Sequence, residues 1–82
     1  MNKIKIVDLR RFDRFKDVQD FVRVANKADN NVSVIAGKYI VNAKSILGMM
    51  SIFYEDSFKL EISYKNENEV ENILKLLEGW VK

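Results

Sequence analysis

Hydrophobic and polar residues alternate in several short stretches of the chain, as expected of strands that bury one face. The first stretch is "KIKIV", and the clearest is "FKLEISYK", where the apolar positions are Phe58, Leu60, Ile62 and Tyr64. Turn residues in "ADNNVSV" precede another strand at residues 32–36, and "AGKYI" makes a tight turn into a strand at residues 39–41. The pattern therefore predicts four strands, two of them joined as a hairpin.

Elsewhere the apolar residues recur at helical spacing. One helix is predicted at residues 17–28, with Asp17 as its N-cap or first-turn acid. A closing helix is predicted from about Asn68 or Glu69, and Trp80 is expected at the edge of the core. The apolar face of the first helix comprises Val18, Phe21, Val22, Ala25 and Ala28, and that of the closing helix comprises Val70, Ile73, Leu74, Leu77 and Val81.

A third, brief helix is predicted in "VNAKSILGMMSI". Ser45 is a strong N-cap residue, so this helix should begin at about Ile46. The complete order is then βαββαβα, which predicts an α+β sandwich with helices covering one face of a sheet.

This helix is shorter than two turns and cannot bury all of its apolar residues on one side. They are Ile46, Leu47, Met49, Met50 and Ile52. One interpretation is a partly exposed apolar patch beside Lys44, suited to protein docking because methionine adapts its shape to a partner. The alternative is that all of these residues belong to the core and that Ser45 is only a cap.

Composition limits the possible chemistry. The chain has 82 residues, 48% of them apolar, which suits a single domain over residues 1–82. It contains no cysteine and no histidine, so thiolate metal sites, imidazole bases and phosphohistidine are excluded. No apolar run suits a signal peptide or a membrane helix, and we expect a cytoplasmic protein without membrane contact, metal or cofactor.

The net charge is only +2 but is unevenly distributed. Residues 1–27 carry eight basic and four acidic side chains, whereas residues 55–82 carry four basic and seven acidic ones. The basic residues Arg10, Arg11, Arg14 and Lys16 cluster before a predicted helix start, where unpaired amides also favour anions, although Asp17 opposes this. A solvated basic loop without function is the alternative, and no motif for nucleic-acid binding is visible.

Two longer stretches, "GKYIVNAKSILGMMSI" and "FVRVANKADNNVSV", resemble the HPr family, the small phosphocarriers of the bacterial phosphoenolpyruvate-dependent sugar phosphotransferase system. The resemblance implies a four-stranded antiparallel sheet with three helices on one face. It also implies a phosphoryl-accepting histidine in a "HARPA"-like motif before the first helix. Ungapped counting from Ser45 places that motif on "RFKDV", with Arg14 at the histidine position, Lys16 at the arginine position and Asp17 at the proline position.

Arg14 cannot accept a phosphoryl group, because its guanidinium stays protonated at neutral pH. The resemblance therefore implies a regulatory protein without catalytic activity, comparable to the HPr-like catabolite-repression paralogue that lacks the histidine and keeps the serine. In Gram-positive members an HPr kinase/phosphorylase phosphorylates the serine equivalent to Ser45, and the product binds a catabolite-control transcription factor.

The resulting expectation is a protein-binding module that is switched at Ser45 and docks through Lys44, Ile46, Leu47 and Met50. Two alternatives remain. One is phosphoryl transfer through a residue other than histidine. The other is binding of an anionic metabolite at residues 10–16.

Overall fold

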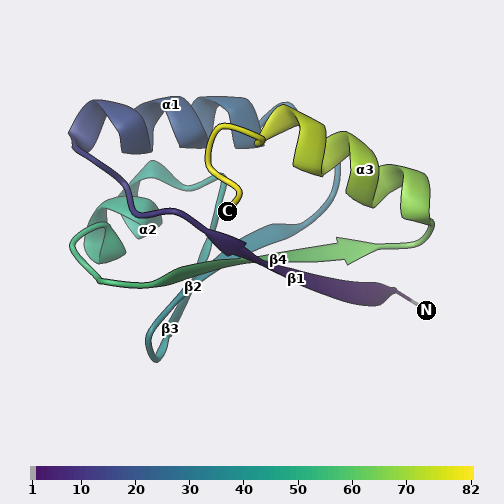
Figure 1. Ribbon diagram of the computed structural model, residues 1–82, viewed down its shortest axis with the longest axis horizontal. Helices are drawn as coiled ribbons and strands as arrows, with labels where there is room; N and C mark the ends of the chain where they lie inside the picture. The colour runs from purple at the N-terminus through teal and green to yellow at the C-terminus, as the bar shows by residue number, and fades with distance from the viewer. Residues whose placement is uncertain (1) are drawn as a thin grey trace.

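The computed structural model describes residues 2–82, which form four strands and three helices (Figure 1). In chain order these are β1 (Lys3–Leu9), α1 (Phe15–Ala25), β2 (Val32–Ala36), β3 (Tyr39–Asn42), α2 (Ile46–Ile52), β4 (Phe58–Tyr64) and α3 (Glu67–Leu76). The predicted order βαββαβα is therefore confirmed. No helix among residues 2–82 has the length and apolar character needed to cross a membrane.

The strands form one antiparallel sheet in the order β1-β4-β2-β3. Strand β4 lies between β1 and β2, with Leu60 opposite Val7 on one side and Val34 on the other. Strands β2 and β3 form the expected hairpin, and Gly37 at its turn has a φ of 60°, which glycine adopts without strain. Figure 1 shows all three helices on the same side of this sheet, as predicted.

The core lies between the sheet and the helices. Alternate residues of β2 and β4 are buried, and helix α1 contributes Val18, Phe21, Val22 and Ala25. An edge-to-face aromatic chain extends from Phe58 through Phe12 and Phe21 to Trp80, with ring centroids 5.0–5.5 Å apart. Trp80 is half-buried at the end of this chain, so its predicted place at the core edge is confirmed.

Strand β1 was correctly predicted, but its isoleucines do not point toward the helices. Ile4 and Ile6 are about half exposed, whereas Leu9 is buried. Their registers explain the difference: Ile6 lies opposite Glu61 of β4, and Leu9 lies opposite buried Phe58. Since successive side chains alternate in direction, Ile4 and Ile6 occupy the sheet face that carries no helix.

The bounds of two helices differ from those predicted. Helix α3 begins at Glu67, because Asn66 and Glu69 form a capping box with bonds of 3.3 Å and 3.2 Å. It ends at Leu76, so Val81 lies beyond the helix and instead forms an antiparallel bridge with Leu9.

Helix α1 runs from Phe15 to Ala25, which is earlier at both ends than the prediction of residues 17–28. Asp17 is a first-turn acid, and Arg14 is at the N-cap without a side-chain capping bond. Ala28 is buried although it lies beyond the helix, which is why it fitted the apolar periodicity.

Candidate functional site

Ser45 caps α2, as predicted. Its backbone is extended (φ −102°, ψ 115°), and its hydroxyl oxygen accepts a hydrogen bond of 3.1 Å from the amide of Gly48. Its carbonyl oxygen accepts from Met49 N at 2.9 Å, which starts the helix. The half-buried hydroxyl thus satisfies one of the unpaired amides of the first turn.

Helix α2 divides its apolar residues between the core and the surface. Met49 and Ile52 are fully buried, whereas Leu47 is 81% exposed and Ile46 is 39% exposed. Met50 is half-buried and packs against the core. The structure therefore places part of the predicted apolar patch in solvent, and its role in docking remains a prediction.

Lys44 is less available than the sequence suggested. Its ammonium donates a 2.5 Å hydrogen bond to the carbonyl oxygen of Ala28, beyond the end of α1. Its own carbonyl oxygen accepts from the side chain of Asn26 at 3.1 Å, and its amide donates to Asn42 Oδ1 at 2.9 Å. Lys44 thus ties the loop before α2 to the end of α1, and a partner would have to compete for its ammonium.

The second candidate site is the loop before α1. Here the carboxylate of Asp17 is only 14% exposed and accepts two hydrogen bonds from the Arg10 guanidinium, at 2.8 Å and 3.1 Å. It also accepts from the indole Nε1 of Trp80 at 2.8 Å and from the amide of Asp13 at 2.9 Å. We call Arg10, Asp17 and Trp80 the carboxylate clamp.

The clamp also fixes the C-terminal segment. Arg10 Nε donates to the carbonyl oxygen of Gly79 at 2.8 Å, the Arg10 amide donates to the carbonyl oxygen of Trp80 at 2.8 Å, and the Arg10 guanidinium lies 5.8 Å from the centre of the Trp80 ring.

The Arg10 hydrogen bond, aided by the Asp13 amide and the Trp80 indole, lowers the pKa of Asp17 to about 2 despite the opposing effect of burial. The same hydrogen bond raises the pKa of Arg10. Asp17 therefore remains anionic at neutral pH, and its fixed charge in the first turn of α1 opposes the binding of another anion there.

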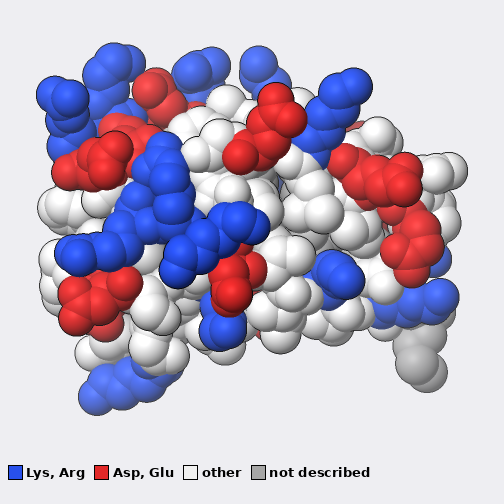
Figure 2. All heavy atoms as spheres, in the orientation of Figure 1, with Lys and Arg blue, Asp and Glu red and all other residues white. Residues whose placement is uncertain are grey.

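The other three basic residues of the predicted anion site are exposed. Arg11 lies 3.7 Å from Asp56, and Lys16 lies 3.4 Å from Asp20. Arg14 has no ion pair within residues 2–82, so it is the basic group left for a bound anion. In Figure 2 the Lys and Arg side chains at this end of the molecule are interspersed with Asp and Glu. Anion binding at residues 10–16 stays a prediction, and it would have to avoid or displace Asp17.

Two exposed aromatic residues, Phe15 and Tyr54, were not predicted from the sequence as site residues. Phe15, the first residue of α1, is 46% exposed, and Tyr54, which follows α2, is 66% exposed. Helices α1 and α2 pack together, and the start of α1 lies above α2 in Figure 1. The sequence did contain a signal for Phe15. It stands at an alanine position of the "HARPA"-like motif, and replacing a small residue by a large apolar one there leaves a side chain that the fold has to place.

The antiparallel sheet β1-β4-β2-β3 with three helices on one face defines a small α+β domain, an open-faced sandwich. The overall architecture is similar to the crystal structure of HPr-C-His from Thermoanaerobacter tengcongensis, with a TM-score of 0.63 and 22% identity over 94% of this chain and 92% of that one. It is also similar to the phosphocarrier protein HPr from Bacillus anthracis str. Ames, with a TM-score of 0.62 and 24% identity over 93% and 94% of the two chains.

The sequence itself shows the family. A family model described as "PTS HPr component phosphorylation site" matches residues 16–79, which is most of the chain. The protein belongs to the HPr family, as the sequence predicted. No curated protein sequence matches this chain.

Proposed function

We propose that this HPr-family protein is a regulatory module that binds other proteins and does not carry phosphohistidine. The observation that carries the proposal is the carboxylate clamp. The chain contains no histidine at all, and Arg10 and Trp80 hold the carboxylate of Asp17 in the first turn of α1. A phosphoryl group placed near this turn would be repelled by a fixed negative charge that already engages the Arg10 guanidinium.

The surface formed by Ile46, Leu47 and Met50 supports docking of a protein partner; we call it the α2 patch. Its most exposed member is Leu47, and a leucine that is 81% exposed contributes little to the fold. Exposed apolar side chains on adjacent positions of one short helix, such as Ile46 and Leu47, are typical of interaction sites. The fixed position of Lys44 argues that apolar contact supplies most of the binding energy on this surface.

Ser45 is the proposed switch. A phosphoserine adds about 1.5 to 2 negative charges at neutral pH and keeps oxygen acceptors for the amide of Gly48. The fold should tolerate this change, since the positive end of a helix favours an anion. A partner that covers Ile46 and Leu47 would nevertheless meet a new charge beside an apolar contact, so phosphorylation would change binding and leave the fold intact.

The first test is intact-protein mass spectrometry after incubation with ATP and an HPr kinase/phosphorylase from the same organism. We expect one added phosphoryl group in the original protein and in a Ser51→Ala variant, and none in Ser45→Ala. Ser51 is a matched control because it is exposed and lies on the same helix. Phosphorylation that persists in Ser45→Ala would contradict the proposed switch.

The second test measures docking by calorimetry, with the catabolite-control transcription factor of the same organism as the probe. Leu47→Ala should weaken binding about fivefold or more, because truncating a central apolar anchor of an interface costs over about 1 kcal/mol. Ile40→Ala is the control, since Ile40 is 64% exposed on β3 and lies outside the α2 patch. The α2 patch is ruled out as the docking site if both variants lose the same amount of affinity or if neither variant loses any.

The alternative of phosphoryl transfer through another residue makes a separate prediction. Treatment with phosphoenolpyruvate and enzyme I would leave an acid-labile phosphoryl group on the protein. We expect none, and its detection would overturn the regulatory proposal even if Ser45 is also phosphorylated.

A further inference from the structure

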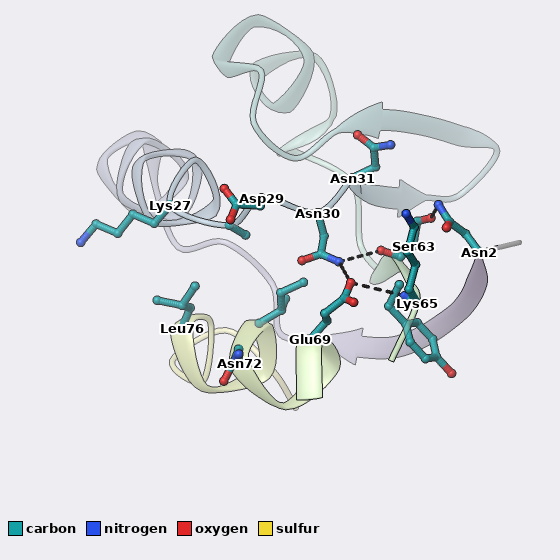
Figure 3. A pocket seen from close by; sticks show the side chains of 13 residues that line it. Asn2, Lys27, Asp29, Asn30, Asn31, Ser63, Lys65, Glu69, Asn72 and Leu76 are labelled. Atoms are coloured by element: carbon teal, nitrogen blue, oxygen red, sulfur yellow. Dashed lines mark hydrogen bonds between the residues drawn. The ribbon is translucent and has the colours of Figure 1, made fainter. Parts of the chain in front are cut away.

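A pocket of about 510 Å³ lies away from both candidate sites described above. Its walls come from the loop between α1 and β2, the end of β4 and helix α3 (Figure 3). This volume falls within the range of roughly 300–1,000 Å³ typical of small-molecule sites. Neither the carboxylate clamp nor the α2 patch contributes a residue to it, so it raises a question independent of the proposed function.

One half of the pocket is already hydrogen-bonded internally. The side-chain nitrogen of Asn30 donates to the carbonyl oxygen of Ser63 at 3.1 Å and to Glu69 Oε1 at 2.5 Å. The hydrogen bond from Asn30, supported by the amides of Lys65 and Asn66, lowers the pKa of Glu69 and keeps it ionised. This half therefore forms a fixed wall.

The other half of the pocket presents polar groups that remain free. The oxygen of Asn30 points away from Glu69, toward the side lined by Asp29 and Asn72 (Figure 3). Within residues 2–82, the side chains of Asp29 and Asn72 make no hydrogen bond or ion pair. An amide both donates and accepts hydrogen bonds, so this side offers several positions to a ligand that can do the same.

The formal charges of the lining residues sum to zero, with Lys27 and Lys65 against Asp29 and Glu69. The Lys27 side chain extends away from Asn30 and Glu69 in Figure 3, so no cluster of basic groups faces the pocket to attract an anion. The pocket also has an apolar part, formed by Ala28, Ile73 and Leu76, of which Leu76 is 39% exposed. A ligand that complements these features is uncharged, carries several hydroxyl groups and has a C–H face that can contact the apolar part.

We propose that this pocket binds an uncharged polyhydroxylated small molecule, a sugar or a sugar alcohol, through Asp29, Asn30 and Asn72. The pocket is open to solvent, and Tyr64, the aromatic residue in its lining, is itself buried. A ligand with about a dozen heavy atoms should therefore bind with a dissociation constant on the order of 1–10 mM.

Binding can be tested by two-dimensional ¹H–¹⁵N NMR of the full chain, titrated separately with glucose, mannitol and sucrose. We expect saturable shifts of the side-chain amides of Asn30 and Asn72 and of the backbone amides at residues 28–31, with no change in α2. Asp29→Ala and Asn72→Ala should each weaken binding about fivefold, the equivalent of one lost hydrogen bond. Neither residue supports the fold through a side-chain hydrogen bond within residues 2–82, so both variants should keep the original spectrum elsewhere.

Asn68→Ala is the matched control, because Asn68 is an exposed asparagine on the same helix and lies outside the pocket. Alanine and inorganic phosphate serve as zwitterionic and anionic control ligands. The proposal is overturned if none of the three polyols produces a saturable shift at the pocket, if Asn68→Ala weakens binding as much as Asn72→Ala, or if alanine or phosphate binds more tightly than all three.

Discussion

Replacing Asp17 by asparagine removes the charge of the carboxylate clamp and keeps the size of the side chain. In the native protein the two carboxylate oxygens together accept from Arg10, Trp80 and the Asp13 amide. An asparagine has a single acceptor oxygen, and its NH₂ group would face donors. Asp17→Asn should therefore destabilise the fold at neutral pH and loosen the C-terminal segment that carries Trp80.

The magnitude follows from the pKa of Asp17. Its lowering from 3.8 to about 2 corresponds to about 2.4 kcal/mol of preferential stabilisation of the anion, at about 1.4 kcal/mol per tenfold change in proton affinity. The carboxylate is 14% exposed, but the Arg10 side chain is 37% exposed and is partly screened by water. We therefore expect a loss of about 1–2 kcal/mol in the free energy of unfolding for Asp17→Asn at pH 7.

The effect must depend on pH in a defined direction. Because folding lowers the pKa of Asp17, the carboxylate contributes its full stabilisation above its ordinary pKa of 3.8. This contribution is lost as the pH falls from that value through about 2, where the folded protein also becomes protonated at Asp17. The native protein and Asp17→Asn should therefore converge in stability at the acid end of this window.

Urea unfolding of both proteins between about pH 2 and pH 7 measures this difference. Trp80 is the single tryptophan and reports the clamp by fluorescence, and circular dichroism reports global unfolding. Asp13→Asn is the matched control, since Asp13 is 80% exposed and only 4.0 Å from Arg10, and it should change stability by less than about 0.5 kcal/mol. A stability difference for Asp17→Asn that stays constant from pH 7 to the acid limit would refute the assignment of this stabilisation to the clamp.

Three further outcomes are expected. Arg14→His should remain unphosphorylated by phosphoenolpyruvate and enzyme I, because the fixed charge of Asp17 in the first turn of α1 repels a phosphoryl group; incorporation of phosphate, measured by intact mass, would contradict this. Ser45→Ala should lower the free energy of unfolding in urea by about 0.5–2 kcal/mol through loss of the cap, and no loss would show the cap to be dispensable. Gly48→Ala should not raise the free energy of unfolding by the roughly 1 kcal/mol that alanine's higher helix propensity would otherwise give, because its Cβ would lie 3.3 Å from the Cβ of Val41. A rise of that size in the same assay would show that the site relaxes freely.

The order of elements could be predicted from the sequence because each element carries its own local signal. The alternation at residues 58–64 and the cap at Ser45 concern neighbouring residues, and the structure confirms both. Which face of β1 is buried could not be predicted in this way. Its alternation of lysine and isoleucine is equally compatible with either face, and the pairing of Ile6 with Glu61 decides which face is buried.

The end of α3 illustrates the same limit. Val81 continues the apolar spacing of the helix, yet it forms a bridge to Leu9 at the other end of the chain. The carboxylate clamp also joins distant residues, since Asp17 and Trp80 are 63 positions apart. No local pattern identifies such a contact, so the sequence could show that Asp17 opposes anion binding but could not show which groups hold its carboxylate.

The two loop sites of this protein differ in what their polar groups can still do. At the start of α1 the carboxylate of Asp17 accepts from the Arg10 guanidinium, the Trp80 indole and the Asp13 amide, and Arg10 and Trp80 also fix the C-terminal segment. At the start of α2 the Ser45 hydroxyl accepts a single hydrogen bond within residues 2–82 and is flanked by exposed Ile46 and Leu47. A new negative charge at the first site would lie beside the fixed carboxylate of Asp17, whereas a new charge at Ser45 would change mainly the surface offered to a partner. The distribution of contacts therefore favours Ser45 over the mouth of α1 as the place where this fold can be regulated without being unfolded.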